Sequence, residues 1–126
     1  MAVALKVTGT DNGGWAVLTV AGELDLVTSP ELRRRVHAVV ADGRHRLVLD
    51  LSDVRFCDSS GVGVLIATRR LLRSCRGRLR LILPDEYGNE GAHVNRVLAA
   101  LGVRRLFDVH PDLATAVTEP DPAAVA

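Results

Sequence analysis

Residues 56–64 of this chain read Phe56-Cys57-Asp58-Ser59-Ser60-Gly61-Val62-Gly63-Val64, and two different hydrophobic patterns meet in them. The segment before them, Arg46 to Leu51, is a short apolar run of the kind that forms a buried strand. After them, small or apolar side chains recur along one helical stripe, at Gly61, Leu65, Thr68, Leu72 and Cys75. The stretch therefore predicts a strand, a short connection and a helix, and α/β folds build functional sites at such connections.

The predicted connection carries one carboxylate and two hydroxyls, those of Asp58, Ser59 and Ser60. Each of the three can accept hydrogen bonds from the free N–H groups of a first helical turn, so all three are candidate N-caps. The same N–H groups favour a bound phosphate. Gly61 lies on the inner stripe of the helix, where another segment of backbone is expected to pass close by.

Two strands and a helix are predicted before this motif. Residues 3–8 and residues 15–20 form strand patterns, and Asp11-Asn12-Gly13-Gly14 between them predicts a hairpin turn. The chain is then expected to leave the second strand over residues 21–25. Thr28 and Glu31 have the spacing of a capping box, which predicts a helix from Thr28 to the stop signal Asp42-Gly43.

After the central helix, the pattern alternates again between strands and helices. Residues 78–83 and 104–109 are predicted as strands, residues 95–102 and 111–117 as helices, and residues 84–91 as a long polar loop. The order β-β-α-β-α-β-α-β-α predicts an α/β fold, a mixed sheet of four to five strands with an N-terminal β-hairpin and about four helices packed on it. We expect one domain over residues 1–118 and a flexible C-terminal tail over residues 119–126.

The composition bounds the functional class. The 126 residues carry 16 lysine and arginine and 15 aspartate and glutamate side chains, a balance that disfavours nucleic-acid binding. We expect no signal peptide and no membrane span, since no apolar run approaches about 20 residues. Cys57 and Cys75 are expected to be free thiols of a cytoplasmic protein. Two basic groups, Arg33-Arg34-Arg35 and Arg69/Arg73/Arg76, are either solvated helix faces, which we favour, or binding patches.

The common enzyme classes find no support in the sequence. The flanks of Ser59 and Ser60 do not form the G-x-S-x-G pattern of a hydrolase nucleophile. The glycines at Gly61 and Gly63 lack the third glycine of a dinucleotide-binding loop, and there is no Walker sequence or zinc-ligand spacing. We therefore expect no catalytic residue, no metal and no cofactor.

Three blocks of the sequence are notable together: Gly22-Glu23-Leu24-Asp25, Leu49-Asp50-Leu51-Ser52-Asp53-Val54 and residues 56–64. In combination they resemble the STAS domains, and more narrowly the bacterial anti-sigma factor antagonists. The resemblance runs from about residue 3 to residue 117 and includes the C-terminal Arg104-Arg105-Leu106-Phe107-Asp108; the loop from Asp85 to Gly91 looks longer than is usual in the family.

The resemblance implies a phosphorylation switch. Ser59 matches the serine that a partner anti-sigma factor with serine kinase activity phosphorylates. Asp25 matches an acidic residue near that serine, and Asp58, Ser60 and Gly61 would belong to the same partner-binding surface. The unphosphorylated protein would bind the anti-sigma factor and release the sigma factor, and a PP2C-type phosphatase would reset it.

A phosphate on Ser59 would add about −1.5 to −2 charges beside Asp58 and weaken binding without refolding. The protein is expected to be a monomer or weak dimer. Two alternatives stay open: a stand-alone STAS scaffold subunit of a signalling or lipid-transport complex, and a small nucleotide-binding or nucleotide-hydrolysing protein.

Overall fold

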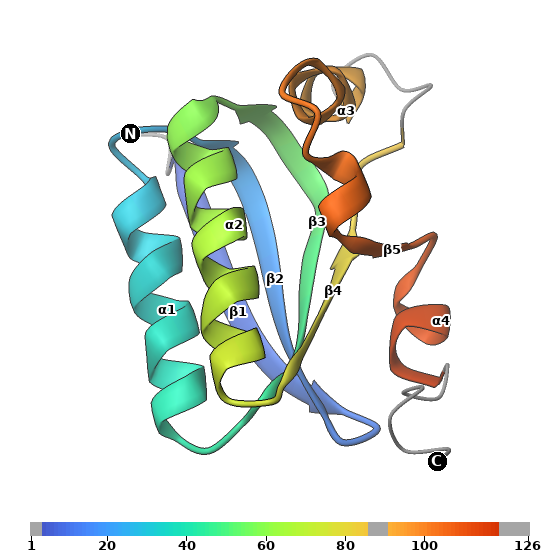
Figure 1. Cartoon of the computed structure of the whole chain (residues 1–126). Helices are drawn as coiled ribbons and strands as arrows, with labels where there is room; N and C mark the ends of the chain where they lie inside the picture. Colours follow the sequence, from blue (N-terminus) through green and yellow to red (C-terminus); the bar gives the residue numbers. More distant parts are fainter. Residues whose placement is uncertain (1–3, 86–90, 119–126) are drawn as a thin grey trace.

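A five-stranded sheet carries helices on both faces in the computed structural model, which describes residues 4–85 and 91–118 (Figure 1). Helices α1 and α2 lie side by side across one face, and the short helix α4 lies on the other. The elements are β1 (Leu5–Asn12), β2 (Trp15–Leu24), α1 (Ser29–Ala41), β3 (Arg46–Cys57), α2 (Ser59–Ser74), β4 (Arg78–Ile82), α3 (Gly91–Ala100), the 3-10 turn η1 (Arg104–Leu106), β5 (Asp108–His110) and α4 (Leu113–Thr118).

The strands follow their order in the chain, β1-β2-β3-β4-β5. β1 pairs with β2 in antiparallel fashion, and the other three pairs are parallel. Gly13 and Gly14 form the hairpin turn with φ angles of 60° and 85°, which glycine adopts without steric cost. The predicted mixed sheet with an N-terminal hairpin is therefore confirmed.

Both central strands are longer than their sequence patterns predict. β2 continues through residues 21–24, where the chain was expected to leave the strand, and pairs there with the second half of β3. Gly22 allows this extension, because its φ is 108° and a Cβ on it would lie 2.3 Å from the carbonyl oxygen of Ala4. Two register shifts between β2 and β3 absorb the resulting bend.

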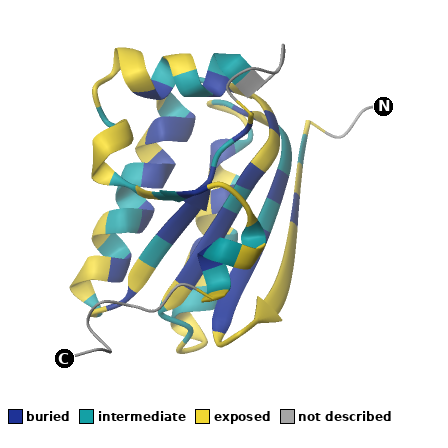
Figure 2. Ribbon diagram, turned by 90° about the vertical axis from the view of Figure 1, so that its right-hand side faces the viewer, coloured by how far each residue is buried: buried dark blue, intermediate teal, exposed yellow. Residues whose placement is uncertain are grey.

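One face of the sheet packs against α1 and α2 and forms the larger part of the core (Figure 2). β3 lies at the centre of the sheet, and its first half is buried on both faces, so the apolar run over residues 47–51 is nearly continuous. The predicted stripe of α2 is buried at Gly61, Leu65, Thr68 and Leu72, while Cys75 is half-buried. Burying a leucine-sized side chain contributes about 1.5–3 kcal/mol, which makes this face the main source of stability.

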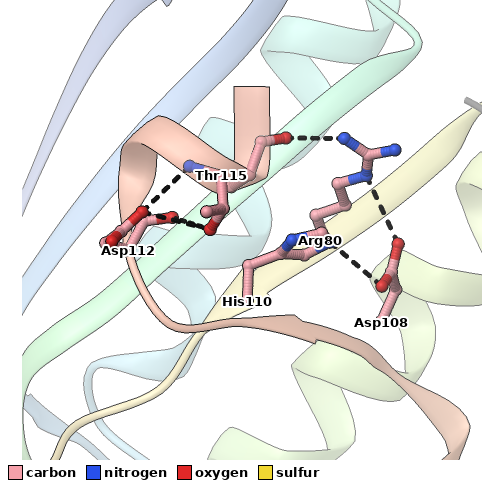
Figure 3. Close-up of polar contacts among 6 residues, drawn as sticks. Arg80, Asp108, His110, Asp112 and Thr115 are labelled. Atoms are coloured by element: carbon pink, nitrogen blue, oxygen red, sulfur yellow. Dashed lines mark hydrogen bonds and ion pairs between the residues drawn. The ribbon is translucent and has the colours of Figure 1, made fainter. Parts of the chain in front are cut away.

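The opposite face holds a second, smaller cluster around Trp15 and Ala116 of α4. Arg80 of β4 is buried there, with its guanidinium carbon 4.3 Å from the centre of a Trp15 ring. Its Nη1 donates to the carbonyl oxygen of Ala116 at 2.7 Å, and its Nε lies 3.3 Å from Oδ2 of Asp108 (Figure 3). Arg80 thus joins β4, β5 and α4.

Two predictions about the C-terminal third need correction. The helix predicted over residues 95–102 already begins at Gly91. The strand predicted over residues 104–109 is instead the turn η1 followed by the short strand β5. Of the predicted polar loop, residues 86–90 lie outside the described residues, as does the predicted tail over residues 119–126.

The three arginines of the first basic group, residues 33–35, do not all lie on a solvated face. Arg33 is exposed, and Arg34 is exposed and pairs with Glu31 at 2.7 Å, as on a solvated face. Arg35, however, donates from Nη1 to the carbonyl oxygen of Val7 at 2.7 Å and so ties α1 to β1. Across residues 4–85 and 91–118, no helix combines the length and the apolar character that crossing a bilayer requires.

Candidate functional site

The start of α2 is built by a single connecting residue, Asp58, between β3 and the helix. Its backbone is extended, and its Oδ1 accepts hydrogen bonds from the N–H groups of Ser60 at 2.8 Å and Gly61 at 3.1 Å. Asp58 is therefore the N-cap, and the serines, which were equal candidates for that role, are not. The sequence had suggested that the N–H groups of the first turn could bind a phosphate. Since the Asp58 carboxylate already accepts hydrogen bonds from two of them, those two N–H groups are not available for that purpose.

The two serines differ in exposure. Ser59 is the first residue of α2 and is exposed, whereas Ser60 is half-buried. No hydrogen bond engages the hydroxyl of either serine within the described ranges. The Ser59 hydroxyl is consequently accessible from solvent and has no structural task within the described part of the molecule.

Gly61 fixes the start of α2 against the end of β2. A Cβ on Gly61 would lie 2.7 Å from the carbonyl oxygen of Leu24 and 2.8 Å from Sγ of Cys57, which is closer than side chains pack. The N–H of Asp58 also donates to the carbonyl oxygen of Leu24, at 3.1 Å. Because Asp25 follows Leu24 directly, the turn after β2 adjoins the end of α2 that carries Ser59.

Asp25 organises the turn between β2 and α1. Its Oδ1 accepts hydrogen bonds from the N–H groups of Val27 at 2.9 Å and Thr28 at 3.0 Å, and from the Thr28 hydroxyl at 3.2 Å. These bonds, led by the one from the Thr28 backbone, lower the pKa of Asp25 below its usual value. The Asp25 carboxylate is thus part of the turn itself.

The capping box predicted for α1 is wrong. Thr28 precedes the helix, but its side chain makes no cap hydrogen bond. Its Oγ1 instead donates to the carbonyl oxygen of Glu23 at 2.7 Å and accepts from the N–H of Asp25 at 2.9 Å. Glu31 likewise pairs with Arg34 rather than reaching back to Thr28. The competing partners come from the turn, which the spacing of Thr28 and Glu31 does not reveal.

Exposed apolar side chains lie at the tip of this turn and were not identified from the sequence. Leu26 is 74% exposed and Val27 is 85% exposed. Phe56, 39% exposed, stacks on His93 at the end of β3, with ring centroids 4.9 Å apart. The available signal was two adjacent large apolar residues within a polar turn, outside any strand or helix period. Adjacent exposed apolar side chains of this size favour a protein-binding surface.

Cys57 lies directly behind the start of α2 and is buried, while Cys75 is half-buried, and both are free thiols as predicted. Burial, and secondarily the Asp58 carboxylate, raise the pKa of Cys57 to about 11. A thiol of that pKa is a poor nucleophile at neutral pH. The described part of the chain also holds no group of three or more histidine, cysteine or acidic side chains placed to bind a metal ion.

Comparison with known proteins gives concordant results. A family model described as the STAS domain matches residues 5–116. The anti-sigma-F factor antagonist RsfB of Mycobacterium tuberculosis is 45% identical over 65 residues, which are 52% of this chain and about half, 53%, of RsfB. An anti-sigma-B factor antagonist of Staphylococcus aureus is 31% identical over 106 residues, 84% of this chain and 93% of that protein.

The fold agrees with a solved structure of the same kind. The crystal structure of an anti-sigma factor antagonist from Mycobacterium paratuberculosis superposes with a TM-score of 0.77 at 32% sequence identity. The superposition covers 90% of this chain and 92% of the other. The fold is therefore shared over nearly the whole length of both chains.

Proposed function

This chain belongs to the STAS domain family, and on that premise we propose that it is an anti-sigma factor antagonist. The names of the mycobacterial and staphylococcal relatives support this role. In the proposed cycle the unphosphorylated protein binds an anti-sigma factor with serine kinase activity, which releases the sigma factor. Phosphate on Ser59 ends this binding, and a PP2C-type phosphatase restores it. The protein acts by binding and not by catalysis, in the cytoplasm, where sigma factors work.

The observation that carries the proposal is the exposed, uncommitted hydroxyl of Ser59 directly after the Asp58 cap. A kinase can reach such a hydroxyl without unfolding the helix. The phosphate would add about −1.5 to −2 charges one residue from the Asp58 carboxylate. Because Asp58 already binds the amides of Ser60 and Gly61, the phosphate oxygens would face the partner and not the helix. Repulsion and desolvation would then weaken the complex.

Leu26 and Val27 are proposed as the apolar part of the partner-binding surface. Asp25, Asp58, Ser60 and Gly61 hold the turn and the start of α2 in place around Ser59, as their hydrogen bonds and close contacts suggest. A binding surface of this kind draws most of its affinity from a few buried apolar contacts, and its charges mainly decide specificity.

The test of the switch compares three variants with candidate anti-sigma kinases in the presence of ATP. We expect Ser59→Ala to bind as wild type and to accept no phosphate, by calorimetry and intact mass. Ser59→Asp should bind at least about tenfold more weakly, because it places a charge in the contact. Ser60→Ala should still be phosphorylated at Ser59. Phosphate on Ser59→Ala, or wild-type affinity of Ser59→Asp, would refute the switch.

The apolar surface has its own test. The double variant Leu26→Ser/Val27→Ser should fold normally, because both side chains are exposed, and should lose about tenfold or more in affinity for the anti-sigma factor. Leu101→Ser is the matched control, since Leu101 is 49% exposed and lies in the turn directly after α3. Equal losses in the two variants would mean that the turn after β2 is not the binding surface.

A further inference from the structure

A groove lies at the far end of α2 from Ser59, between that helix, β4 and η1. Its volume is about 430 Å³, and four arginines line it: Arg69 and Arg73 from α2, with Arg78 and Arg80 from β4. Asp108 is the single acidic residue among the described residues that line it. The 16 residues of α2 extend over about 24 Å at 1.5 Å per residue, so the groove is remote from the surface proposed for the anti-sigma factor.

The groove is formed by the most basic part of the sequence. Residues 59–84 contain six arginines and no acidic residue. The rest of the chain holds ten cationic and fifteen acidic side chains, so the near-neutral total conceals a strong asymmetry. A local excess of one sign in a concave surface raises the local concentration of ions of the opposite sign.

The arginines in the groove differ in the partners they already have. Arg80 bonds with Asp108 and Ala116 (Figure 3), and Arg69 donates from Nε to the carbonyl oxygen of Leu106 at 2.8 Å. The Leu106 bond holds the Arg69 guanidinium at the rim of the groove. The Arg73 guanidinium, one helical turn further on, makes no hydrogen bond or ion pair within the described part of the chain.

Helix stability explains only part of this arrangement. A cation in the last turn, such as Arg73, interacts favourably with the carboxyl end of the helix. That effect does not account for Arg78 and Arg80, which come from a strand and face the same groove. Since Asp108 is positioned to balance the charge of Arg80, the guanidinium groups of Arg69 and Arg73 leave an excess of positive charge on the concave surface.

We propose that this groove binds a small organic dianion, a phosphate monoester carried on a compact apolar body. The guanidinium groups of Arg69 and Arg73 provide the planar pairs of N–H donors that match phosphate oxygens. Phe107, half-buried at the lining of the groove, provides apolar contact for the body of the ligand. The combination of a few convergent charges with an apolar wall is the usual character of a small-molecule site.

The probe is phenyl phosphate, titrated into the full chain and followed through the arginine side-chain and backbone N–H signals in NMR spectra. We expect a saturable shift of the Arg69 and Arg73 signals, with inorganic phosphate binding more weakly because it lacks the apolar body. Arg73→Gln should lower the affinity at least tenfold. Arg70→Gln, a neighbouring exposed arginine of α2 outside the groove, should leave it unchanged.

Shifts that grow linearly without saturation, or an equal effect of Arg70→Gln, would overturn the proposal in favour of general charge attraction. Tighter binding of a tetraglutamate peptide than of phenyl phosphate would overturn it in favour of an acidic protein segment. Ser59→Ala should bind phenyl phosphate as wild type, so this result is independent of the proposed switch. Thermal melting of each variant confirms that loss of affinity is not loss of the fold.

Discussion

At the scale of single residues, Asp58, Ser59 and Gly61 divide the tasks at the start of α2. Asp58 caps the helix, Gly61 lets it approach β2, and Ser59 is left with an accessible hydroxyl. Because the cap and the close contact are made by its neighbours, Ser59 can change its chemistry at little cost in stability.

Gly61 is expected to reject any side chain, whereas Gly63 on the same helix should accept one. Gly61→Ala places its Cβ within 2.8 Å of atoms of Leu24 and Cys57, so the melting temperature should fall by several degrees or more. Gly63→Ala meets nothing within 4 Å and should stabilise the helix by about 0.5–1 kcal/mol. Thermal denaturation of both variants measures the contrast, and equal effects would contradict the packing described for Gly61.

The two thiols should react at very different rates with a disulfide reagent at pH 8. Cys57 is 1% exposed with a pKa raised to about 11, so about one molecule in a thousand carries its thiolate. Cys75 is half-buried and directly follows the last residue of α2. We expect one thiol per molecule to react rapidly with the reagent. This rapid reaction should be lost in Cys75→Ala and retained in Cys57→Ala. Two rapid equivalents in the folded protein would be inconsistent with the burial of Cys57.

At the scale of elements, the turn between β2 and α1 owes its shape to Asp25. Three hydrogen bonds converge on one carboxylate oxygen, and the Thr28 hydroxyl links the turn back to Glu23. The turn can therefore present Leu26 and Val27 to solvent on a fixed backbone. The role expected for Asp25 in partner exchange stays a proposal, and its hydrogen bonds give it a structural role as well.

The turn should make stability depend on pH. The pKa of Asp25 is lowered in the folded protein, so its contribution is present above the unfolded pKa and is lost as the pH falls through the folded value. The melting temperature should thus decrease as the pH is lowered beyond about 4. Glu31, bonded to Arg34, and Asp112, bonded to the Thr115 backbone, have lowered pKa values and add to the same trend.

Two substitutions at Asp25 test the origin of this trend. Asp25→Asn keeps an acceptor oxygen but does not titrate, so its melting temperature should fall less steeply with acid than that of wild type. Asp25→Ala removes the acceptor and should be less stable at every pH. An unchanged acid slope in Asp25→Asn would show that Glu31, Asp112 or other groups cause the trend.

At the scale of the whole molecule, the second face of the sheet depends on Arg80. This buried cation joins β4, β5 and α4 (Figure 3) and lies beside Trp15, whereas α1 and α2 pack on the other face through apolar contacts. Trp15 is the single tryptophan of the chain, so its fluorescence reports on this face alone.

Arg80→Leu should loosen α4 and destabilise the protein by about 1–3 kcal/mol, because the Ala116 carbonyl loses its donor. The Trp15 emission should shift to longer wavelength. Asp108→Asn is the comparison: Asp108 is 59% exposed and the amide oxygen can still accept a hydrogen bond from Nε of Arg80, so the loss of stability should be smaller than in Arg80→Leu and the emission unchanged. Urea denaturation followed by fluorescence compares the two. A larger loss of stability in Asp108→Asn than in Arg80→Leu would show that Asp108, and not Arg80, is the main stabilising residue of this face.

The sequence by itself determined the features that depend on near neighbours. The hairpin at Gly13-Gly14, the strand–helix connection at Asp58 and the buried stripe of α2 follow from turn chemistry, capping and periodicity over a few residues. The Asp58-Ser59-Ser60-Gly61 sequence also carried the family resemblance, together with two blocks upstream of it.

Only the tertiary structure decided which partner each polar side chain takes. Thr28 bonds with the turn and not with its helix, and Gly22 lets β2 continue beside Ala4. Arg80, which reads as one position of an alternating strand, is buried between Trp15 and α4. Each outcome depends on a contact between segments distant in sequence or on competition among several acceptors. The sequence shows the cluster of arginines between residues 69 and 80, but only the packing of α2 against β4 turns four of them toward one groove.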